Sequence, residues 1–353
     1  MDMDEQPDDD YKDKGLTGLS NLGNTCFMNS TLQCLSHTYC LNTFLKSGEY
    51  RKRVNKKPES LILLEWDKLR ELMWSENCVI SPGGFLSSVQ KVAKIKDQPL
   101  FTGFAQNDLA EFLIFIINCF HTSISRDVDM KITGQTITDT DKLAKNCFEM
   151  MKNMYCKEYS EFLKIFYGIH VSKLETITGE YLTSTPEPFL LLDLPLPDKT
   201  QESNESCTLG DCLEMYTKEE LLDGENKYKI EKTGEWVDAK KQILFWSLPD
   251  ILIITIKRFS NSLKKNEALV DFPLVNLDLS KYVIGYDSED YIYNLYGVCN
   301  HMGGISGGHY TACVKNANEK WYHYNDQDIT PIEKEDTVVS PFGYCLFYCK
   351  KNN

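Results

Sequence analysis

The stretch Asn21-Leu22-Gly23-Asn24-Thr25-Cys26-Phe27-Met28-Asn29-Ser30 reads as a polar turn that leads into a helix. Glycine and asparagine suit such a turn because both tolerate unusual backbone angles. Met28, Leu32 and Leu35 then follow at the spacing of one apolar helix face. Cys26 falls in the first turn, where unpaired N–H groups and the helix dipole favour a thiolate. The pattern allows a buried structural cysteine or a nucleophile, and a nucleophile needs a base.

The composition limits the class of protein. The chain has 353 residues, of which 42% are hydrophobic and 25% are charged, as in soluble globular proteins with a substantial core. The net charge of −14 argues against a nucleic-acid binder. No apolar run is long enough to span a membrane, and the acidic start does not resemble a signal peptide. The 13 scattered cysteines predict a reducing compartment, either the cytoplasm or the nucleus.

The order of patterns along the chain predicts an α+β fold. Residues 1–14 form an acidic, apolar-poor segment that we expect to be disordered. Helices are concentrated in the first half of the chain, and strands in the last third. The expected helices are Leu61–Trp74, Gln106–Phe120 and Thr208–Leu222, and the expected strands are Asp250–Ile256, Tyr291–Cys299, His309–Val314, Lys320–Asn325 and Gly343–Tyr348.

A base for Cys26 can be sought among the histidines. His309 follows the glycine-rich segment 303–308 at the start of a predicted strand, and glycines let another backbone approach closely. By composition alone, His301 and His323 are equal candidates, and the glycines favour His309. At the end of the next strand, Asn325 and Asp326 are both positioned to lie beside His309.

Asp108 and Glu111 lie three residues apart near the start of a predicted helix. Acidic side chains are favoured there by the helix dipole alone, so the residues by themselves indicate a solvated acidic patch. The alternative interpretation is a docking point for a basic peptide.

Several of these segments resemble one known family in order. Residues 18–30 resemble the cysteine box of the ubiquitin-specific protease family of papain-like cysteine proteases. The segment Gly307-Gly308-His309-Tyr310-Thr311-Ala312, followed by residues 321–326, resembles its histidine box. The segment Gln106-Asn107-Asp108-Leu109-Ala110-Glu111-Phe112-Leu113 and the closing residues 345–348 are similar to further landmarks of the family. The resemblance covers about 15–348.

The resemblance implies a hand-like, papain-like α+β fold in one catalytic domain. It predicts a helical thumb (about 15–165), β-rich fingers (about 166–248) and an antiparallel-sheet palm (about 249–348). It also implies a thiol-dependent deubiquitinase that hydrolyses the isopeptide bond after the C-terminal glycine of ubiquitin through a thioester. A ubiquitin-binding pseudoenzyme and a protease for a ubiquitin-like modifier are the alternatives.

Roles for particular residues follow from the same resemblance. Cys26 is expected to be the nucleophile and His309 the general base and acid, with Asn325, or alternatively Asp326, orienting the histidine. Asn21 is expected to donate to the oxyanion. For substrate binding, the resemblance favours Asp108 and Glu111 as ligands of an arginine in the ubiquitin tail, and Gly307 and Gly308 as part of a narrow cleft for its Gly-Gly end.

One departure from the family concerns metal. Many members hold zinc in the fingers with two Cys-x-x-Cys pairs, and the corresponding regions 173–179 and 228–234 contain no cysteine. We therefore expect no structural zinc and no cofactor. The expected partners are ubiquitin and ubiquitinated proteins, with no nucleic acid and no membrane, and the chain is expected to be a monomer.

Overall fold

The computed structural model describes residues 11–198, 200, 205–231, 233–259, 264–304 and 307–351. Most of its helices lie in the first half of the chain. The α-helices are α1 (Cys26–Ser36), α2 (Tyr39–Lys46), α3 (Ser60–Met73), α4 (Gly83–Ile95), α5 (Leu109–Ile124), α6 (Asp139–Glu158), α7 (Phe162–Phe166) and α9 (Leu209–Thr217). The 3-10 helices are η2 (Glu49–Lys52), η3 (Pro99–Phe101), η4 (Gly224–Asn226), η5 (Ser280–Tyr282), η6 (Ser288–Asp290) and η7 (Glu335–Val338).

Two sheets organise the rest of the chain. A four-stranded antiparallel sheet has the order β4-β3-β10-β7, and a larger sheet has the order β17-β16-β15-β14-β18-β11-β5, with β13 beside β14. The four-stranded sheet is built from β3 (Gly168–Thr176), β4 (Tyr181–Phe189), β7 (Glu220–Leu222) and β10 (Ala239–Ser247). The larger sheet is built from β5 (Leu192–Leu194), β11 (Ile251–Ile256), β13 (Leu277–Asp278), β14 (Ile292–Gly304), β15 (Gly307–Lys315), β16 (Trp321–Asn325), β17 (Asp328–Pro331) and β18 (Gly343–Lys350). Short pairs are β1 (Gly18–Leu19) with β2 (Val79–Ile80), β6 (Cys207–Thr208) with β12 (Val270–Asp271), and β8 (Tyr228–Lys229) with β9 (Trp236–Val237).

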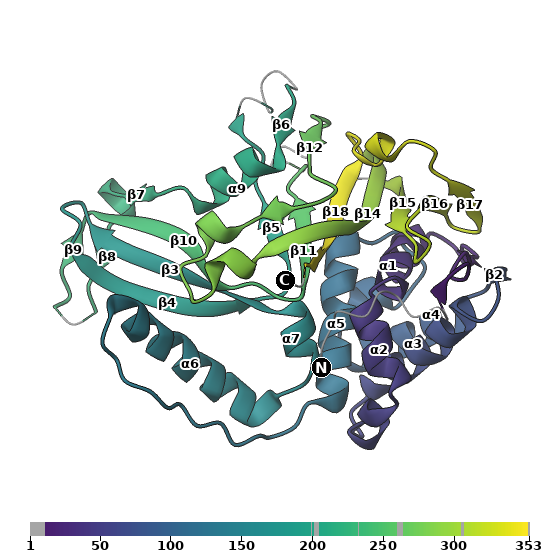
Figure 1. Cartoon of the computed structure of the whole chain (residues 1–353), viewed down its shortest axis with the longest axis horizontal. Coiled ribbons are helices and arrows are strands. Elements are labelled where there is room, and N and C mark those ends of the chain that lie inside the picture. Colours follow the sequence, from purple (N-terminus) through teal and green to yellow (C-terminus); the bar gives the residue numbers. More distant parts are fainter. Residues whose placement is uncertain are drawn as a thin grey trace.

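The arrangement of these layers is hand-like, as predicted. In Figure 1 the helices α1 to α5 form one lobe, the thumb, against the larger sheet, which is the palm. The four-stranded sheet extends away from them as the fingers, with α6 along one side and α9 on the other. The palm differs from the antiparallel prediction at one edge, because β5 joins β11 in parallel. The α+β fold class is confirmed.

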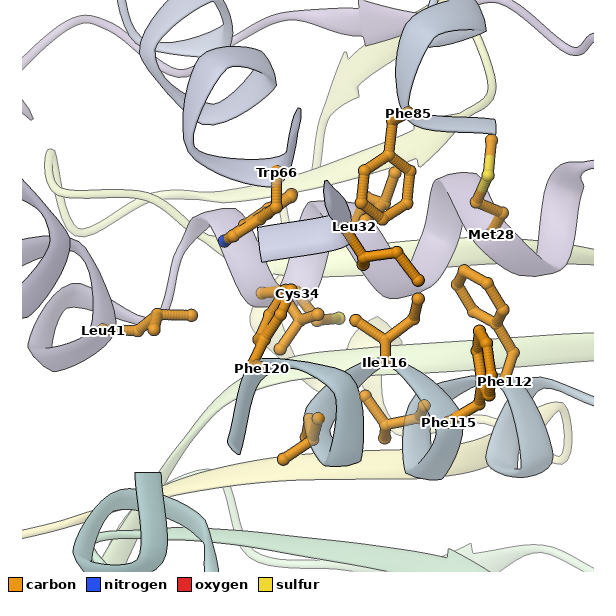
Figure 2. Packing of buried hydrophobic residues seen from close by; sticks show 14 of the residues in the cluster. Met28, Leu32, Cys34, Leu41, Trp66, Phe85, Phe112, Phe115, Ile116 and Phe120 are labelled. Carbon is orange, nitrogen blue, oxygen red and sulfur yellow. The ribbon is translucent and has the colours of Figure 1, made fainter. Parts of the chain in front are cut away.

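Helix α1 is the centre of the thumb, and all its residues are buried. Met28, Leu32 and Leu35 are fully buried, as their spacing predicted. Figure 2 shows Leu32 of α1 extending toward Ile116 of α5. The opposite side of α1 lies against the palm strands β14 to β16. The nucleophile candidate therefore starts a helix that is fixed on both sides.

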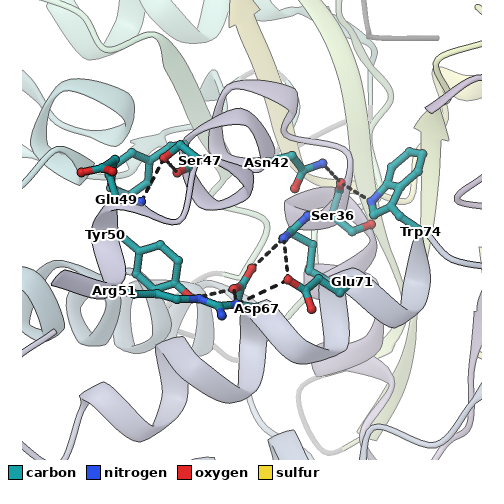
Figure 3. Close-up of polar contacts among 11 residues, drawn as sticks. Ser36, Asn42, Ser47, Glu49, Tyr50, Arg51, Asp67, Glu71 and Trp74 are labelled. Atoms are coloured by element: carbon teal, nitrogen blue, oxygen red, sulfur yellow. Dashed lines mark hydrogen bonds and ion pairs between the residues drawn. The ribbon is translucent and has the colours of Figure 1, made fainter. Parts of the chain in front are cut away.

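The Asp67 carboxylate of α3 binds both the preceding helix η2 and a buried arginine of its own helix. The Asp67 carboxylate accepts bonds from Tyr50 Oη at 2.5 Å, from Arg51 at 2.8 Å and from Arg70 at 2.6 Å (Figure 3). Burial by itself would raise the pKa of Asp67, but these donors hold it below its usual value. Because Asp67 and Arg70 are both buried, removing either partner would cost about 3–5 kcal/mol of stability.

Several predicted boundaries were wrong. Helix α5 begins at Leu109 rather than Gln106, because the Asp108 side chain accepts the Glu111 N–H at 3.0 Å and caps the helix there. Helix α9 ends at Thr217, and residues 220–222 form a strand. Helix α6 and strand β17 were not predicted.

The N-terminal boundary also differs from the prediction. Residues 1–10 of the predicted disordered tail lie outside the described residues. Tyr11 is buried, and its ring packs edge-on against Trp74 with the centroids 4.7 Å apart. The folded part of the chain therefore includes Tyr11, which lies before the predicted start at Gly15.

Candidate active site

The turn before Cys26 is closed by its own side chains. Asn21 Oδ1 accepts bonds from the Gly23 N–H at 3.0 Å and the Thr25 N–H at 3.1 Å. Thr25 Oγ1 in turn accepts the Leu22 N–H at 2.9 Å. Gly23 and Asn24 both have positive φ, at 103° and 55°, which explains why these residue types occur here. The turn delivers Cys26 to the first position of α1, as predicted.

The surroundings of the Cys26 thiol act against the thiolate that a helix start favours. Its side chain is buried, and this burial raises the pKa of the thiol. The backbone N–H of Tyr310 acts in the opposite direction, and the nearby Asp326 carboxylate adds to the increase in pKa. Burial therefore makes ionisation of Cys26 harder than that of an ordinary cysteine, and a nearby proton acceptor would assist it.

His309 lies on β15, directly before Tyr310, whose backbone N–H faces the Cys26 thiol. Its Nε2 atom is 2.6 Å from Asn325 Oδ1, at the end of β16. An amide oxygen only accepts hydrogen bonds, so Nε2 carries a proton and Nδ1 keeps a lone pair. His309 and Asn325 thus meet from two adjacent palm strands, and the Tyr310 backbone, directly after His309, contacts the Cys26 thiol of the thumb.

The Asp326 side chain contacts the turn before Cys26 and helix α1. Its Oδ2 accepts the Asn21 amide at 2.9 Å, and its Oδ1 accepts the Asn29 amide at 2.7 Å. Its backbone oxygen also accepts the Leu19 N–H at 2.9 Å. The two adjacent residues that the sequence left as alternatives therefore have different contacts, Asn325 with His309 and Asp326 with the segment 19–29.

The two other histidines considered from the sequence lie in different surroundings. His301 is buried among aromatic rings, with its centroid 4.6 Å from that of Tyr310. Burial and the Lys265 charge lower the pKa of His301 to about 4. His323 lies on β16, and burial, assisted by His309, lowers its pKa.

Asp108 and Glu111 have unlike surroundings although they are three residues apart. Both oxygens of Asp108 are engaged, one by the Glu111 N–H and the other by the Tyr344 hydroxyl at 2.6 Å. Glu111 is exposed and lies at a groove of about 400 Å³ along α5. The groove is lined by Lys96, Gln98, Leu100, Phe101, Glu111, Ile114, Phe115, Asn118, Cys119 and Thr122.

The described residues of the two finger segments where the resemblance would place zinc ligands include no cysteine. The residues at 173–176 lie on β3, and those at 228–229 on β8, without any cysteine among them. Cys207 and Cys212 have their sulfur atoms 3.9 Å apart, on β6 and α9 rather than together on one helix. Across the described ranges, no group of three or more His, Cys, Asp or Glu side chains could hold a metal ion.

Three residues of the site were not singled out from the sequence. Asn29 holds Asp326, Tyr344 holds Asp108, and Gln106 binds the backbone of Gly308. Gln106 and Asn29 lie within the segments that resemble the family, but nothing in their local pattern indicates these contacts.

Within the described part of the chain, no helix has the length and hydrophobicity needed to cross a bilayer.

Comparisons with known proteins agree with this geometry. The family described as ubiquitin carboxyl-terminal hydrolase matches residues 17–348. The chain is 33% identical to ubiquitin carboxyl-terminal hydrolase 2 of Bos taurus over 347 residues, which cover 95% of this chain and 55% of that protein. It is 32% identical over 345 residues to ubiquitin carboxyl-terminal hydrolase Usp2 of Drosophila melanogaster, covering 96% of this chain and 35% of that protein.

A solved structure shares the fold. It is the SAGA Ubp8/Sgf11/Sus1/Sgf73 DUB module bound to ubiquitin aldehyde, with a TM-score of 0.72 and 25% identity, covering 97% of this chain and 71% of that chain. The chain spans about half, or less, of the length of the two curated relatives. The order of the motifs, the hand-like fold and these matches lead to one conclusion. The chain belongs to the ubiquitin carboxyl-terminal hydrolase family.

Proposed function

We propose that this chain is a thiol-dependent deubiquitinase that hydrolyses the isopeptide bond after the C-terminal glycine of ubiquitin. The observation that carries the proposal is the 2.6 Å contact between His309 Nε2 and Asn325 Oδ1, beside a cysteine at the start of a buried helix. A nucleophile, a base and a group that orients the base form the unit that covalent acyl transfer requires.

The proposed reaction has two halves. His309 Nδ1 takes the Cys26 proton while the sulfur attacks the glycine carbonyl, and the same proton then passes to the departing lysine amine. The first half leaves a thioester on Cys26. In the second half, His309 takes a proton from water, the hydroxide oxygen attacks the thioester carbonyl, and the Cys26 sulfur leaves and regains a proton. The raised pKa of Cys26 makes this base necessary in the first half.

Asn21 is the proposed donor to the oxyanion, together with the backbone N–H of Cys26. The Asn21 amide carries two N–H bonds, and Asp326 accepts one of them. The other remains available to the tetrahedral intermediate. Asp326 therefore fixes the orientation of the Asn21 amide, whereas Asn325 orients the His309 ring.

These two roles predict different effects on rate. Asn325→Ala is expected to lower kcat about 10-fold, because one hydrogen bond to His309 contributes about 1–1.5 kcal/mol. Asp326→Asn is expected to lower kcat about 100-fold, because its amide has one acceptor oxygen for the two amides of Asn21 and Asn29, and its NH2 group faces the one that is left without an acceptor. Hydrolysis of a fluorogenic ubiquitin C-terminal amide measures both.

The hairpin formed by β16 and β17 supplies a matched control for these variants. Asp328→Asn changes an exposed carboxylate two residues away, and the rate should stay within about twofold of wild type. If Asp326→Asn were as active as Asp328→Asn, the role proposed for Asp326 would be wrong.

Recognition of the ubiquitin tail is proposed to depend on Glu111, Gly307 and Gly308. Glu111 is exposed, so its carboxylate is available to an arginine, whereas both oxygens of Asp108 already accept bonds. Among the described residues, a side chain on Gly307 would meet only the Gln106 amide, at 3.7 Å. The fold itself therefore does not require glycine at this position, which supports a role for Gly307 in admitting substrate. We propose that Asp108 acts by holding the start of α5.

The proposed partners are ubiquitin and ubiquitinated proteins, with the chain acting as a monomer. We propose the cytoplasm or the nucleus as its location, because the described cysteines form no disulfide.

The decisive experiment reacts the wild-type chain with ubiquitin that carries a thiol-reactive warhead at its C-terminus. We expect one adduct per chain, at Cys26, identified by peptide mass spectrometry. A parallel panel of ubiquitin-like modifiers with the same warhead tests the substrate. Preferred reaction with another modifier would overturn the ubiquitin assignment, and binding of ubiquitin without any adduct would indicate the pseudoenzyme instead.

A further inference from the structure

One side chain of the thumb binds both backbone groups of the residue before His309. The Gly308 N–H donates to Gln106 Oε1 at 3.0 Å, and Gln106 Nε2 donates to the Gly308 carbonyl oxygen. The two residues are 202 positions apart in sequence, and Gln106 precedes α5. A carboxamide has one acceptor and one donor group side by side, so it satisfies both backbone groups at once.

The position of this contact on β15 gives it mechanical importance. Strand β16 pairs with β15 from Ala312 to Lys315 and not as far as Gly308. The Gln106 amide therefore hydrogen-bonds the Gly308 backbone, near the start of β15, in the way that a neighbouring strand would. His309 lies between the end of the β16 pairing and the Gln106 contact.

Gly308 also packs closely against β14. A Cβ atom at Gly308 would lie only 2.4 Å from His301 Nε2 and 2.5 Å from the Met302 carbonyl oxygen. The glycine is therefore enclosed between the His301 ring, the β14 backbone and the Gln106 amide. Together with these neighbours, the Gln106 contact sets the position of the Gly308 backbone, to which His309 is joined.

The thumb end of the contact is also fixed, and it is fixed to the cysteine turn. The Asn24 amide donates to the Phe104 carbonyl oxygen at 3.1 Å. Asn24 lies two residues before Cys26, and Phe104 lies two residues before Gln106. Asp108, two residues after Gln106, is bound to Tyr344 of β18. The short path Cys26–Asn24–Phe104–Gln106–Gly308–His309 therefore joins the two sides of the proposed active site.

We propose that Gln106 is a positioning residue that keeps the His309 ring within proton-transfer reach of the Cys26 thiol by holding the Gly308 backbone. The inference rests on the proposed function, since it assigns Cys26 and His309 as the nucleophile and base. Gln106 acts through Gly308 and does not touch the reacting atoms. A misplacement of about 1 Å between reacting groups can lower a rate about 100-fold, so a contact one residue from the base has a measurable effect.

The test uses Gln106→Met, which keeps the length of the side chain and removes both hydrogen bonds. The matched control is Gln90→Met, because Gln90 is also a thumb glutamine whose amide donates to a backbone oxygen, that of Gly103 at 3.1 Å. The first readout is the rate at which iodoacetamide alkylates Cys26 as a function of pH, followed by peptide mass spectrometry without any ubiquitin. The others are kcat and KM on a fluorogenic ubiquitin amide, and thermal unfolding.

In Gln106→Met, we expect the midpoint of Cys26 alkylation to move up by about one pH unit, because His309 Nδ1 no longer lies where it can accept the proton that the buried thiol gives up. The kcat is expected to fall about 10- to 100-fold, with KM within about twofold of wild type. Gln90→Met should change neither the midpoint nor kcat.

Three outcomes would overturn the proposal. A raised KM with an unchanged alkylation profile would mean that Gln106 binds the substrate itself. A lower kcat that accompanies a lower unfolding temperature, with an unchanged profile, would mean a role in folding only. Unchanged kinetics and profile would mean that the contact is dispensable. If the wild-type chain hydrolysed no ubiquitin substrate, the proposed function would fail, while the alkylation profile would still test the positioning of His309.

Discussion

Replacing Cys26 with alanine is expected to lower the hydrolysis rate of a fluorogenic ubiquitin amide by at least about 10⁴-fold, because the nucleophile of a covalent mechanism is removed. The substitution removes one sulfur atom at the start of α1, and the turn 21–25 keeps its own hydrogen bonds. Binding of ubiquitin to Cys26→Ala, measured by calorimetry, should therefore persist. Steady-state hydrolysis and binding together separate loss of chemistry from loss of recognition.

The chain provides a control for this variant among its other cysteines. Cys78 is exposed, and Cys78→Ala should stay within about twofold of the wild-type rate. If Cys26→Ala hydrolysed the substrate at the rate of Cys78→Ala, another group would be the nucleophile.

Replacing His309 with alanine is expected to lower kcat about 10³-fold at neutral pH, in the range that general acid–base catalysis contributes. The pH dependence should change as well. Burial raises the pKa of Cys26, so without His309 the thiol stays neutral to a higher pH than an ordinary cysteine. The residual rate of His309→Ala should therefore keep rising with pH beyond the point where the wild-type rate levels off. A pH profile of kcat/KM from pH 6 to about 10 measures this, bracketing the ordinary thiol pKa.

His323→Ala is the matched control, because His323 lies on the adjacent strand β16 and was an equal candidate by composition. Its rate should remain within a few-fold of wild type. A loss in His323→Ala as large as that in His309→Ala, with the same change in pH profile, would contradict the assignment of the base.

Periodic patterns in the sequence were sufficient for the elements that carry the two main groups. Met28, Leu32 and Leu35 predicted the buried face of α1, and the apolar run 251–256 predicted the fully buried strand β11. Such predictions succeed because helices and strands place side chains at fixed local spacing. The boundaries of elements were predicted less accurately. The first residue of α5, for example, depends on the capping side chain of Asp108 rather than on spacing.

Contacts between distant residues were beyond the reach of such patterns. The residues alone left Asn325 and Asp326 open as partners of His309, and the family resemblance favoured Asn325 with Asp326 as the alternative. In the structure Asn325 contacts His309, whereas Asp326 contacts Asn21, 305 residues earlier in the chain. Adjacent residues at the end of a strand turn in different directions, and no local pattern shows which of them faces the partner strand.

Electrostatics also depended on the tertiary structure. The sequence placed Cys26 at a helix start, which favours a thiolate but equally allowed a buried cysteine, and the fold buries the side chain, which raises its pKa. The sequence by itself determined which helix and which strand carry the cysteine and the histidine, because local spacing and residue type are enough for that. Only the tertiary structure decided which polar side chains meet around them, such as Gln106 with Gly308, because these contacts join segments that are distant in the chain.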